Sequence, residues 1–238
     1  MVYATTKRRQ YNGYTRRRKF KSKYAKLNPR TGGSIGQELM FRDQSDDAVT
    51  VPSTTTLMVI DEPASGCLNG MSQGSGESER VGMRVVNKRL DINVNWNQDG
   101  TTSQVLRLLV VQDTQTNGTM MTGDAFMPDK VSGLLDQNLN FANPFNSHRF
   151  KILYDKTFQG TQPSRYWNGS AEVSPEGTKF IKIRLKLGGK KGIVTRYTTT
   201  GNTVSAIADN SFHLLAVADQ SAGSDTLSWF SRLRYYSV

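Results

Sequence analysis

The sequence has almost none of the residues on which disulfide scaffolds and most metal or acid–base sites depend. Among 238 residues there is one cysteine, Cys67, and there are two histidines, His148 and His213. A single cysteine cannot form an intramolecular disulfide, which excludes a disulfide-stapled secreted scaffold. No His, Cys and carboxylate cluster has the spacing of a zinc site, and no nucleophile elbow is present, although composition alone leaves a Ser/His/Asp arrangement open. We therefore expect a protein that is not an enzyme and that needs no cofactor.

The chain also lacks a long apolar run. No segment approaches the roughly 20 apolar residues that a membrane-spanning helix needs, and the amino terminus is basic rather than hydrophobic. We expect a soluble intracellular product without membrane insertion. No long amphipathic helical pattern is present either, which leaves strands as the main elements.

Acidic residues are missing from the amino-terminal segment, because no Asp or Glu occurs before Glu38. The chain has 31 Lys and Arg against 20 Asp and Glu, and 11 of the basic residues lie within 7–30. The remaining 20 basic residues match the 20 acidic ones, so the whole excess of +11 belongs to this segment. Its basic residues are Lys7, Arg8, Arg9, Arg16, Arg17, Arg18, Lys19, Lys21, Lys23, Lys26 and Arg30. A polycationic segment beside a neutral body indicates a polyanionic partner.

Residues 1–36 form the predicted arm, which ends in a glycine-rich hinge. Leu, Ile and Val are absent between Val2 and Leu27, so no apolar face could pack in a core, and we expect disorder in isolation. Lys and Arg neutralise phosphates while aromatic rings stack on unpaired bases, which favours single-stranded nucleic acid. The aromatic residues predicted to bind with the cations are Tyr11, Tyr14, Phe20 and Tyr24.

Other interpretations of the arm are a nuclear localisation signal and a merely solubilising tail. A signal read by host import machinery is compatible with nucleic-acid binding, since both need clustered Lys and Arg. Binding to a membrane surface is the weaker competitor, because an interfacial segment needs an apolar face opposite its charged one.

The body, residues 37–238, contains eight strand candidates separated by unequal loops. Apolar residues alternate in most of them, and the alternation slips near Val85 and Val86, which predicts a bulge. The segment 105–111 is apolar on both faces, as in a strand covered on each side. The turn Gly188-Gly-Lys-Lys-Gly predicts a hairpin between two of the candidates. The candidates are 54–61, 80–96, 105–111, 148–158, 179–187, 193–198, 212–219 and 229–236.

Eight strands, unequal loops and little helix predict an all-β, eight-stranded antiparallel jelly-roll sandwich rather than an up-and-down barrel. Lettered in chain order from B to I, the predicted strands are centred near Leu57, Leu90, Leu108, Ile152, Ile183, Val194, Leu215 and Leu233.

Four segments carry a resemblance to a known family. They are RVGMRVVNKRLDI at 80–92, LRLLVVQD at 106–113 followed by Asn117-Gly118, RFKILYDKT at 149–157, and the aromatic, Arg-rich FSRLRYY at 230–236. In order and spacing they resemble the capsid proteins of small circular Rep-encoding single-stranded DNA viruses, and they are similar also to the satellite tobacco necrosis virus coat protein. The resemblance covers roughly residues 66–238.

The resemblance implies a jelly-roll subunit that assembles with copies of itself. About 60 copies would form a small icosahedral T=1 shell, with the arm inside and a single-stranded genome as cargo, DNA favoured over RNA. It implies localisation in the virion, with assembly in the host nucleus. The alternative function is a non-capsid single-stranded nucleic-acid-binding protein with a basic tail.

Further candidate site residues lie on the predicted strands. In related jelly rolls the sheet of strands B, I, D and G commonly faces the interior, which favours Arg232 and Arg234 as additional nucleic-acid contacts. Basic residues on another strand candidate are the alternative row, namely Lys182, Arg184 and Lys186. Subunit contacts are expected from loop residues, namely Met120, Met121, Phe126, Phe141, Phe145 and Trp167.

Three aspartates end predicted strands and raise the question of a structural calcium site. Asp113, Asp155 and Asp219 would form one if they gathered at the same rim of the sandwich. We favour the simpler interpretation that each begins a turn.

Overall fold

The computed structural model describes residues 39–51, 58–59, 65–98, 105–116, 118–126, 146–160, 166–167, 172–173, 177–218 and 225–238. The chain divides into two units, residues 1–36 and 37–238, and the fold below belongs to the second. All the arm residues predicted to bind nucleic acid lie outside the described residues.

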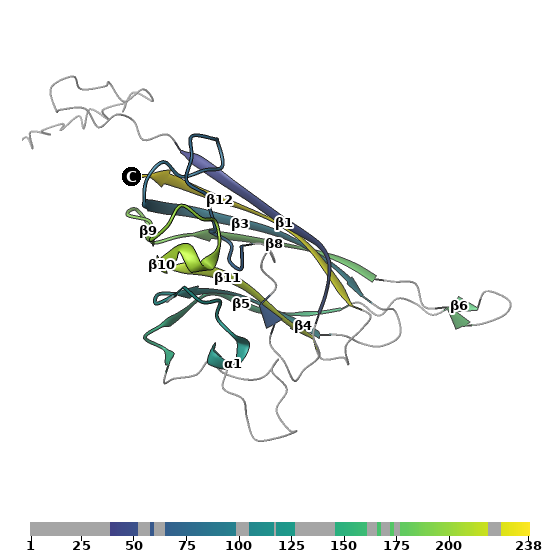
Figure 1. Cartoon of the computed structure of the whole chain (residues 1–238). Coiled ribbons are helices and arrows are strands. Elements are labelled where there is room, and N and C mark those ends of the chain that lie inside the picture. The colour runs from purple at the N-terminus through teal and green to yellow at the C-terminus, as the bar shows by residue number, and fades with distance from the viewer. Residues whose placement is uncertain are drawn as a thin grey trace, which may run out of the picture. The chain divides into compact units, whose positions relative to one another are not determined.

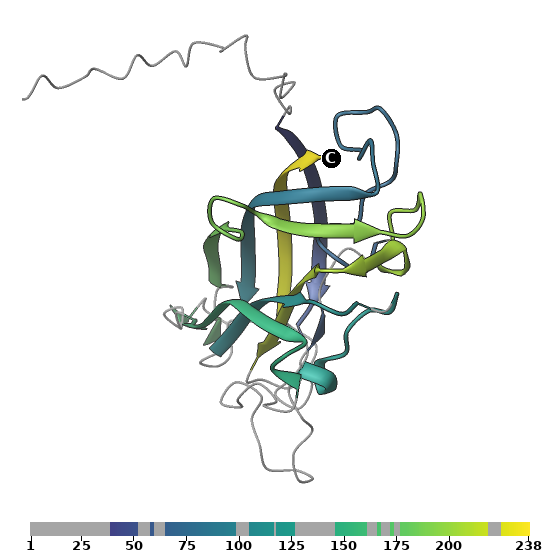
Figure 2. The ribbon, with the colours of Figure 1, turned by 90° about the vertical axis from the view of Figure 1, so that its left-hand side faces the viewer.

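Two antiparallel sheets face each other across the core (Figure 1). In the first sheet β12 (Thr226–Ser237) lies between β1 (Met40–Thr50) and β3 (Arg84–Gln98), as Figure 2 also shows. The other edge of β3 pairs with the strands β8 (Gly177–Lys186) and β9 (Ile193–Tyr197), and β9 pairs with β10 (Ile207–Asp209).

The second sheet has the order β2, β11, β4, β5. These strands are β2 (Met58–Val59), β11 (Ser211–Ala218), β4 (Val105–Asp113) and β5 (Phe150–Gln159). The other described elements are a small hairpin, one helical turn and a short 3-10 helix: β6 (Tyr166–Trp167), β7 (Glu172–Val173), α1 (Gly123–Phe126) and Val204–Ala206.

The strand order confirms the predicted jelly roll. With β1, β2, β3, β4, β5, β8, β11 and β12 lettered B to I, one sheet has the order B-I-D-G and the other C-H-E-F. The predicted letters were wrong over part of the chain: Leu90 lies in D, Leu108 in E, Ile152 in F and Ile183 in G, one letter later than expected. Val194, expected in G, lies in the additional strand β9. The cause of the shift is β1, an edge strand whose sequence MFRDQSDDAVT lacks apolar alternation and therefore gave no strand signal.

The hairpin predicted between 179–187 and 193–198 is wrong. Both segments pair with β3, β8 opposite Arg89–Gln98 and β9 opposite Arg84–Asn87, so they run in line along one edge. The interruption lies opposite Lys88, which is also the extra residue of β3 in its pairing with β12. The predicted bulge is therefore present, two residues later than expected.

The core fills the space between the sheets. Leu90, Ile92, Val94 and Trp96 of β3 point into it, which confirms the alternation expected there. Alternate residues of β4 and β11 enter a second apolar cluster on the far face of their sheet, which contains Leu109, Val111, Met121, Phe126, Phe150, Leu215 and Val217. The expectation that 105–111 is covered on both faces is confirmed. No helix among the described residues is long and apolar enough to cross a membrane.

Candidate nucleic-acid interface

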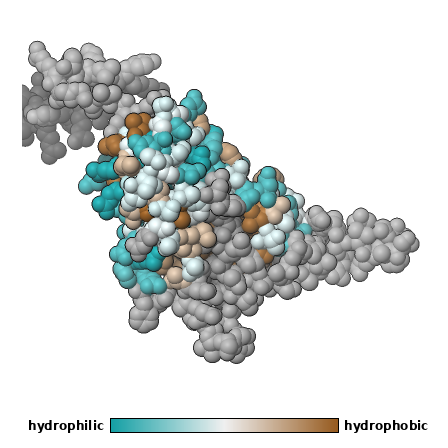
Figure 3. Space-filling view, in the orientation of Figure 1, coloured by the Kyte–Doolittle hydropathy of each residue, from teal (hydrophilic) through white to brown (hydrophobic). Residues whose placement is uncertain are grey.

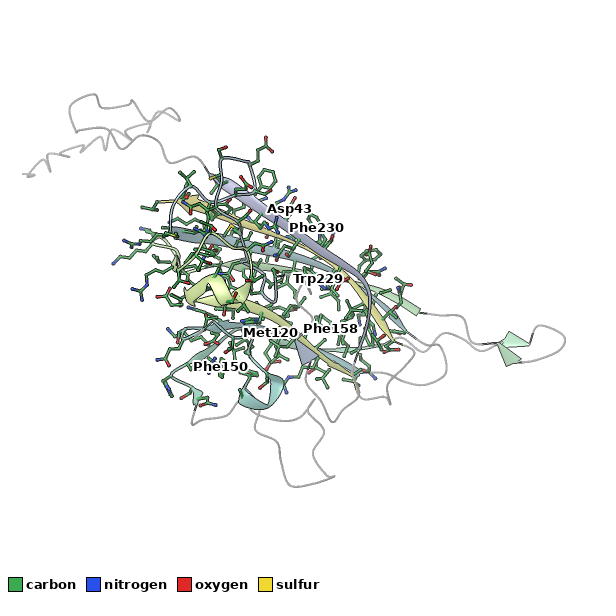
Figure 4. All side chains as sticks on the ribbon, viewed as in Figure 1. Asp43, Met120, Phe150, Phe158, Trp229 and Phe230 are labelled. Atoms are coloured by element: carbon green, nitrogen blue, oxygen red, sulfur yellow. The ribbon has the colours of Figure 1, made fainter. Side chains whose placement is uncertain are left out.

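The face of the first sheet that points away from the core is here called the outer face. Side chains alternate along a strand, so the neighbours of buried residues such as Ile92 and Leu233 must point outward. Figure 4 shows Asp43 and Phe230 on this face and Trp229 on the opposite one, toward the second sheet. In the order β1, β12, β3, β8, three rows cross the outer face: Phe41, Arg234, Arg89 and Lys186; Asp43, Arg232, Asp91 and Arg184; Ser45, Phe230, Asn93 and Lys182.

These three rows carry a clear excess of positive charge. They hold six cations and two carboxylates, Asp43 and Asp91. Since the sequence after residue 30 contains equal numbers of basic and acidic residues, the excess on this face is a product of folding. A sheet face of this kind attracts a polyanion.

Arg232 is held in place by Asp43 on the neighbouring strand. Its Nε and Nη2 donate to the two carboxylate oxygens at 2.7 and 2.6 Å. The hydrogen bonds and charge of Asp43 raise the pKa of Arg232. The guanidinium lies 4.9 Å from the ring centre of Phe41 and 5.9 Å from that of Phe230. Arg232 is thus oriented and largely neutralised by its own neighbours.

Asp91 is the centre of a cluster of three arginines. Its carboxylate accepts from Arg89 at 2.8 Å and from Arg234 at 3.1 Å, and Arg184 Nε lies 3.6 Å away. One carboxylate cannot neutralise three guanidinium groups, so the cluster keeps a positive excess. The exposed Lys182 and Lys186 flank it, and neither forms an ion pair within the described part of the chain.

The structure brings together two sets of residues that the sequence presented as alternatives. Arg232 and Arg234 of β12 lie on the same face as the β8 row of Lys182, Arg184 and Lys186. Sequence reasoning missed the carboxylates that connect them, as well as Arg89. On β3, Arg89 and Asp91 alternate with the buried Leu90 and Ile92, and this alternation marks an exposed face of the strand. Only the strand pairing shows which cations of the neighbouring strands meet there.

Two of the loop residues expected at subunit contacts are instead part of the subunit's own core. Met121 and Phe126 are each 1 % exposed, and Phe126 packs edge-on against Phe150 at 5.9 Å between ring centres. They cover the apolar far face of β4 and β11. Met120 is exposed, whereas Phe141, Phe145 and the side chain of Trp167 lie outside the described residues.

The two histidines and the single cysteine were the residues considered for catalysis or metal binding. His213 is fully buried in β11, where Nε2 lies 2.8 Å from Ser211 Oγ, and that hydroxyl accepts from Thr116 at 3.0 Å. All three residues are fully buried. His148 is exposed in the turn before β5 and not in a strand as expected. Cys67 is buried, and its thiol donates to the Ser65 carbonyl at 3.8 Å.

Of the aspartates considered for calcium, the two that the structure describes, Asp113 and Asp155, do not lie at one rim. Asp113 ends β4, where Arg149 donates to both its oxygens at 2.9 and 2.8 Å and has its own pKa raised as a result. Asp155 lies in the middle of β5, opposite Leu109, and pairs with Arg107, so the expectation that it begins a turn is wrong. Asp219 is outside the described residues. The described residues contain no group of three or more His, Cys, Asp or Glu suited to a metal ion.

Comparison with known proteins adds little to this picture. No protein-family model and no curated protein matches the chain. Among solved structures, the chain is similar to the VP1 pentamer of human polyomavirus 6, with 9 % identity and a TM-score of 0.31, over 87 % of this chain and 96 % of that one. So distant a likeness carries no argument, and the fold assignment rests on the strand order.

Proposed function

We propose that this chain is a viral capsid protein that assembles with copies of itself into a small icosahedral, T=1 shell around a single-stranded genome. The observation that carries the proposal is the outer face: a jelly-roll body with equal numbers of basic and acidic residues concentrates cations on its B-I-D-G sheet. The arm adds a charge of +11 to the same chain.

Closed assembly explains why both cationic parts belong to one protein. A symmetric shell brings together many copies of each cationic part, so that modest individual affinities multiply. The genome neutralises the repulsion between these cations, which links packaging to assembly. Single-stranded DNA is the favoured cargo, as the sequence resemblance implies. Delivery to the host nucleus through the basic arm fits the same proposal.

Exposed apolar side chains at one end of the sandwich are proposed subunit contacts. The Val81 N–H donates to Ser237 Oγ at 2.9 Å and the Val238 N–H donates to the Arg84 carbonyl at 3.0 Å, so these segments adjoin. Val81, Val238 and nearby Met83 are all exposed. On the side shown in Figure 3, hydrophobic areas are small and separated by hydrophilic ones. Such mixed surfaces are typical of interfaces between separately folded subunits.

The second candidate function is a small nucleic-acid-binding protein with a basic tail, which the cationic outer face would serve equally well. The size of the particles in solution distinguishes a capsid protein from a small nucleic-acid-binding protein. Electron microscopy of the purified full chain should show uniform closed particles, and nucleic acid inside them should resist added nuclease until the particles are opened. DNase and RNase treatment of the released material then identifies the cargo. A species of a few tens of kilodaltons with unprotected nucleic acid would favour the small binding protein.

A further inference from the structure

Two phenylalanine side chains on the outer face are exposed, and a surface that bound only phosphate groups would not need them. Phe180 of β8 is 74 % exposed and Phe230 of β12 is 39 % exposed. Both stand at outward positions of strands whose inward neighbours, Ile181 and Trp229, are buried. Neither ring contributes to the core, so folding does not explain them.

The two rings flank the polar middle of the sheet. Phe230 pairs with Asn93 of β3, and Phe180 pairs with Asn95, the next outward residue of that strand. The positions of Phe180 and Phe230 are two strands apart across the sheet and two residues apart along it, which corresponds to a separation of about 12 Å. That distance suits nearby unpaired bases of an extended strand. The amide side chains between the rings offer hydrogen-bond donors and acceptors for base edges.

Cations lie next to both rings. Lys182 follows Phe180 on the same face of β8, and Arg232 lies over Phe230 at 5.9 Å. Aromatic rings beside basic groups on a sheet surface are the combination by which proteins bind unpaired bases, stacking the base and neutralising its phosphate.

We propose that the outer face is a stacking platform for single-stranded nucleic acid, with unpaired bases on Phe180 and Phe230 and phosphates on Lys182, Arg184 and Arg234. The inference rests on the proposed function for its setting, but it names a binding site separate from the arm. Duplex does not fit, because its bases are already stacked and do not reach the rings. A protein partner fits less well, since protein interfaces are depleted in lysine at their centre.

The test uses the full chain and short thymidine oligonucleotides, compared with abasic oligonucleotides of the same length. At raised salt, phosphate contacts weaken more than stacking does. We expect the double variant Phe180→Ala/Phe230→Ala to lose about tenfold or more in affinity for the thymidine probe and little for the abasic probe. Ile152→Ala removes an exposed apolar side chain of the second sheet and should bind both probes as the parent chain does.

Photo-crosslinking of an iodouracil-containing oligonucleotide, followed by peptide mass spectrometry, locates the contact. Cross-links in the peptides around Phe180 and Phe230 are expected. Cross-links confined to residues 1–36, or unchanged thymidine affinity in the double variant, would overturn the inference. So would loss of particle formation with unchanged binding, because the rings would then belong to a protein contact. Particle formation is measured independently of cross-linking. A protein that cross-links at Phe180 and Phe230 but forms no shells would contradict the proposed function and still support the stacking platform.

Discussion

Arg80 is a fully buried arginine whose partners are backbone carbonyls rather than a carboxylate. Its guanidinium donates to Met71 at 3.0 Å, to Gly82 at 2.8 Å and to Thr199, and it stacks over Tyr197 at 4.1 Å. Burial lowers the pKa of Arg80. The sequence could not predict this role, because carbonyl acceptors have no residue-type signature and Thr199 is 119 positions away.

Replacing Arg80 should be among the most damaging single changes in the body. Arg80→Met removes the donors and leaves the buried Met71 carbonyl and the partly buried Gly82 and Thr199 carbonyls without this partner. We expect a loss of about 3 kcal/mol in the free energy of unfolding. Urea unfolding of dissociated subunits measures the loss. Arg84→Ala, at an exposed position on the next strand, should change stability by less than about 0.5 kcal/mol. Equal effects of the two variants would contradict the assigned role.

Tyr235 predicts a loss of stability at alkaline pH. Burial, partly offset by Arg42 and reinforced by Glu79, raises its pKa from 10.0 to about 12. Its hydroxyl also donates to the Glu79 carbonyl at 2.7 Å, a bond that requires the proton. Because the folded state holds this proton more tightly than the unfolded state, the contribution is complete below pH 10 and is lost as the pH rises through about 12.

Urea unfolding at several pH values between 9 and 12 tests this expectation. Tyr235→Phe should be less stable than the parent at pH 9, because it lacks the hydrogen bond, and its stability should fall less steeply as the pH rises. Parallel curves for the two proteins would show that Tyr235 does not titrate as described.

At the scale of elements, the sequence predicted those strands whose burial pattern is visible in their own residues. Alternation located β3 and β12, and continuous apolar residues located β4 and β11. It failed for β1, whose polar sequence suits an edge and whose register is fixed by pairing with β12. It also failed for the connection between β8 and β9, because a glycine-rich turn does not show whether the chain reverses or continues along the same neighbour.

The glycines of that connection are not equivalent. Gly192 has φ +81°, and a Cβ there would lie 2.7 Å from the Asn87 carbonyl and from a Val86 methyl carbon. Gly189 has φ +58° and open space around the corresponding position. Gly189→Ala should therefore lose only the roughly 1–2 kcal/mol of a left-handed conformation, and Gly192→Ala clearly more. Thermal unfolding of both variants checks the order, and a reversed order would contradict the path of the chain along β3.

Asp91 should limit the affinity of the outer face for nucleic acid. Asp91→Asn removes the carboxylate shared by Arg89, Arg184 and Arg234, so more positive charge becomes available to phosphates. We expect severalfold tighter binding of single-stranded DNA and a salt dependence of log K that is steeper by about 1. Asp155→Asn makes the same change in net charge on the second sheet and should have a smaller effect. Equal effects would mean that only the net charge matters.

At the scale of the whole molecule, the distribution of charge follows from composition and strand pairing together. Composition was enough to place the net charge of +11 in the arm and to leave the rest of the chain balanced. It could not show that folding sorts the balanced charges, because residues far apart in sequence, such as Asp43 and Arg232, meet only through strand pairing. The arm and the outer face are the two cationic surfaces of the proposed shell subunit.

The mass of the full chain purified under native conditions tests the account most directly. A T=1 shell of about 60 subunits of 26.5 kDa should have a protein mass of about 1.6 MDa in a single narrow distribution, increased by the packaged nucleic acid. Native mass spectrometry or single-particle mass measurement in solution resolves this value. A population confined to monomers or small oligomers, with nucleic acid present in excess, would contradict the proposal that this jelly roll builds a shell.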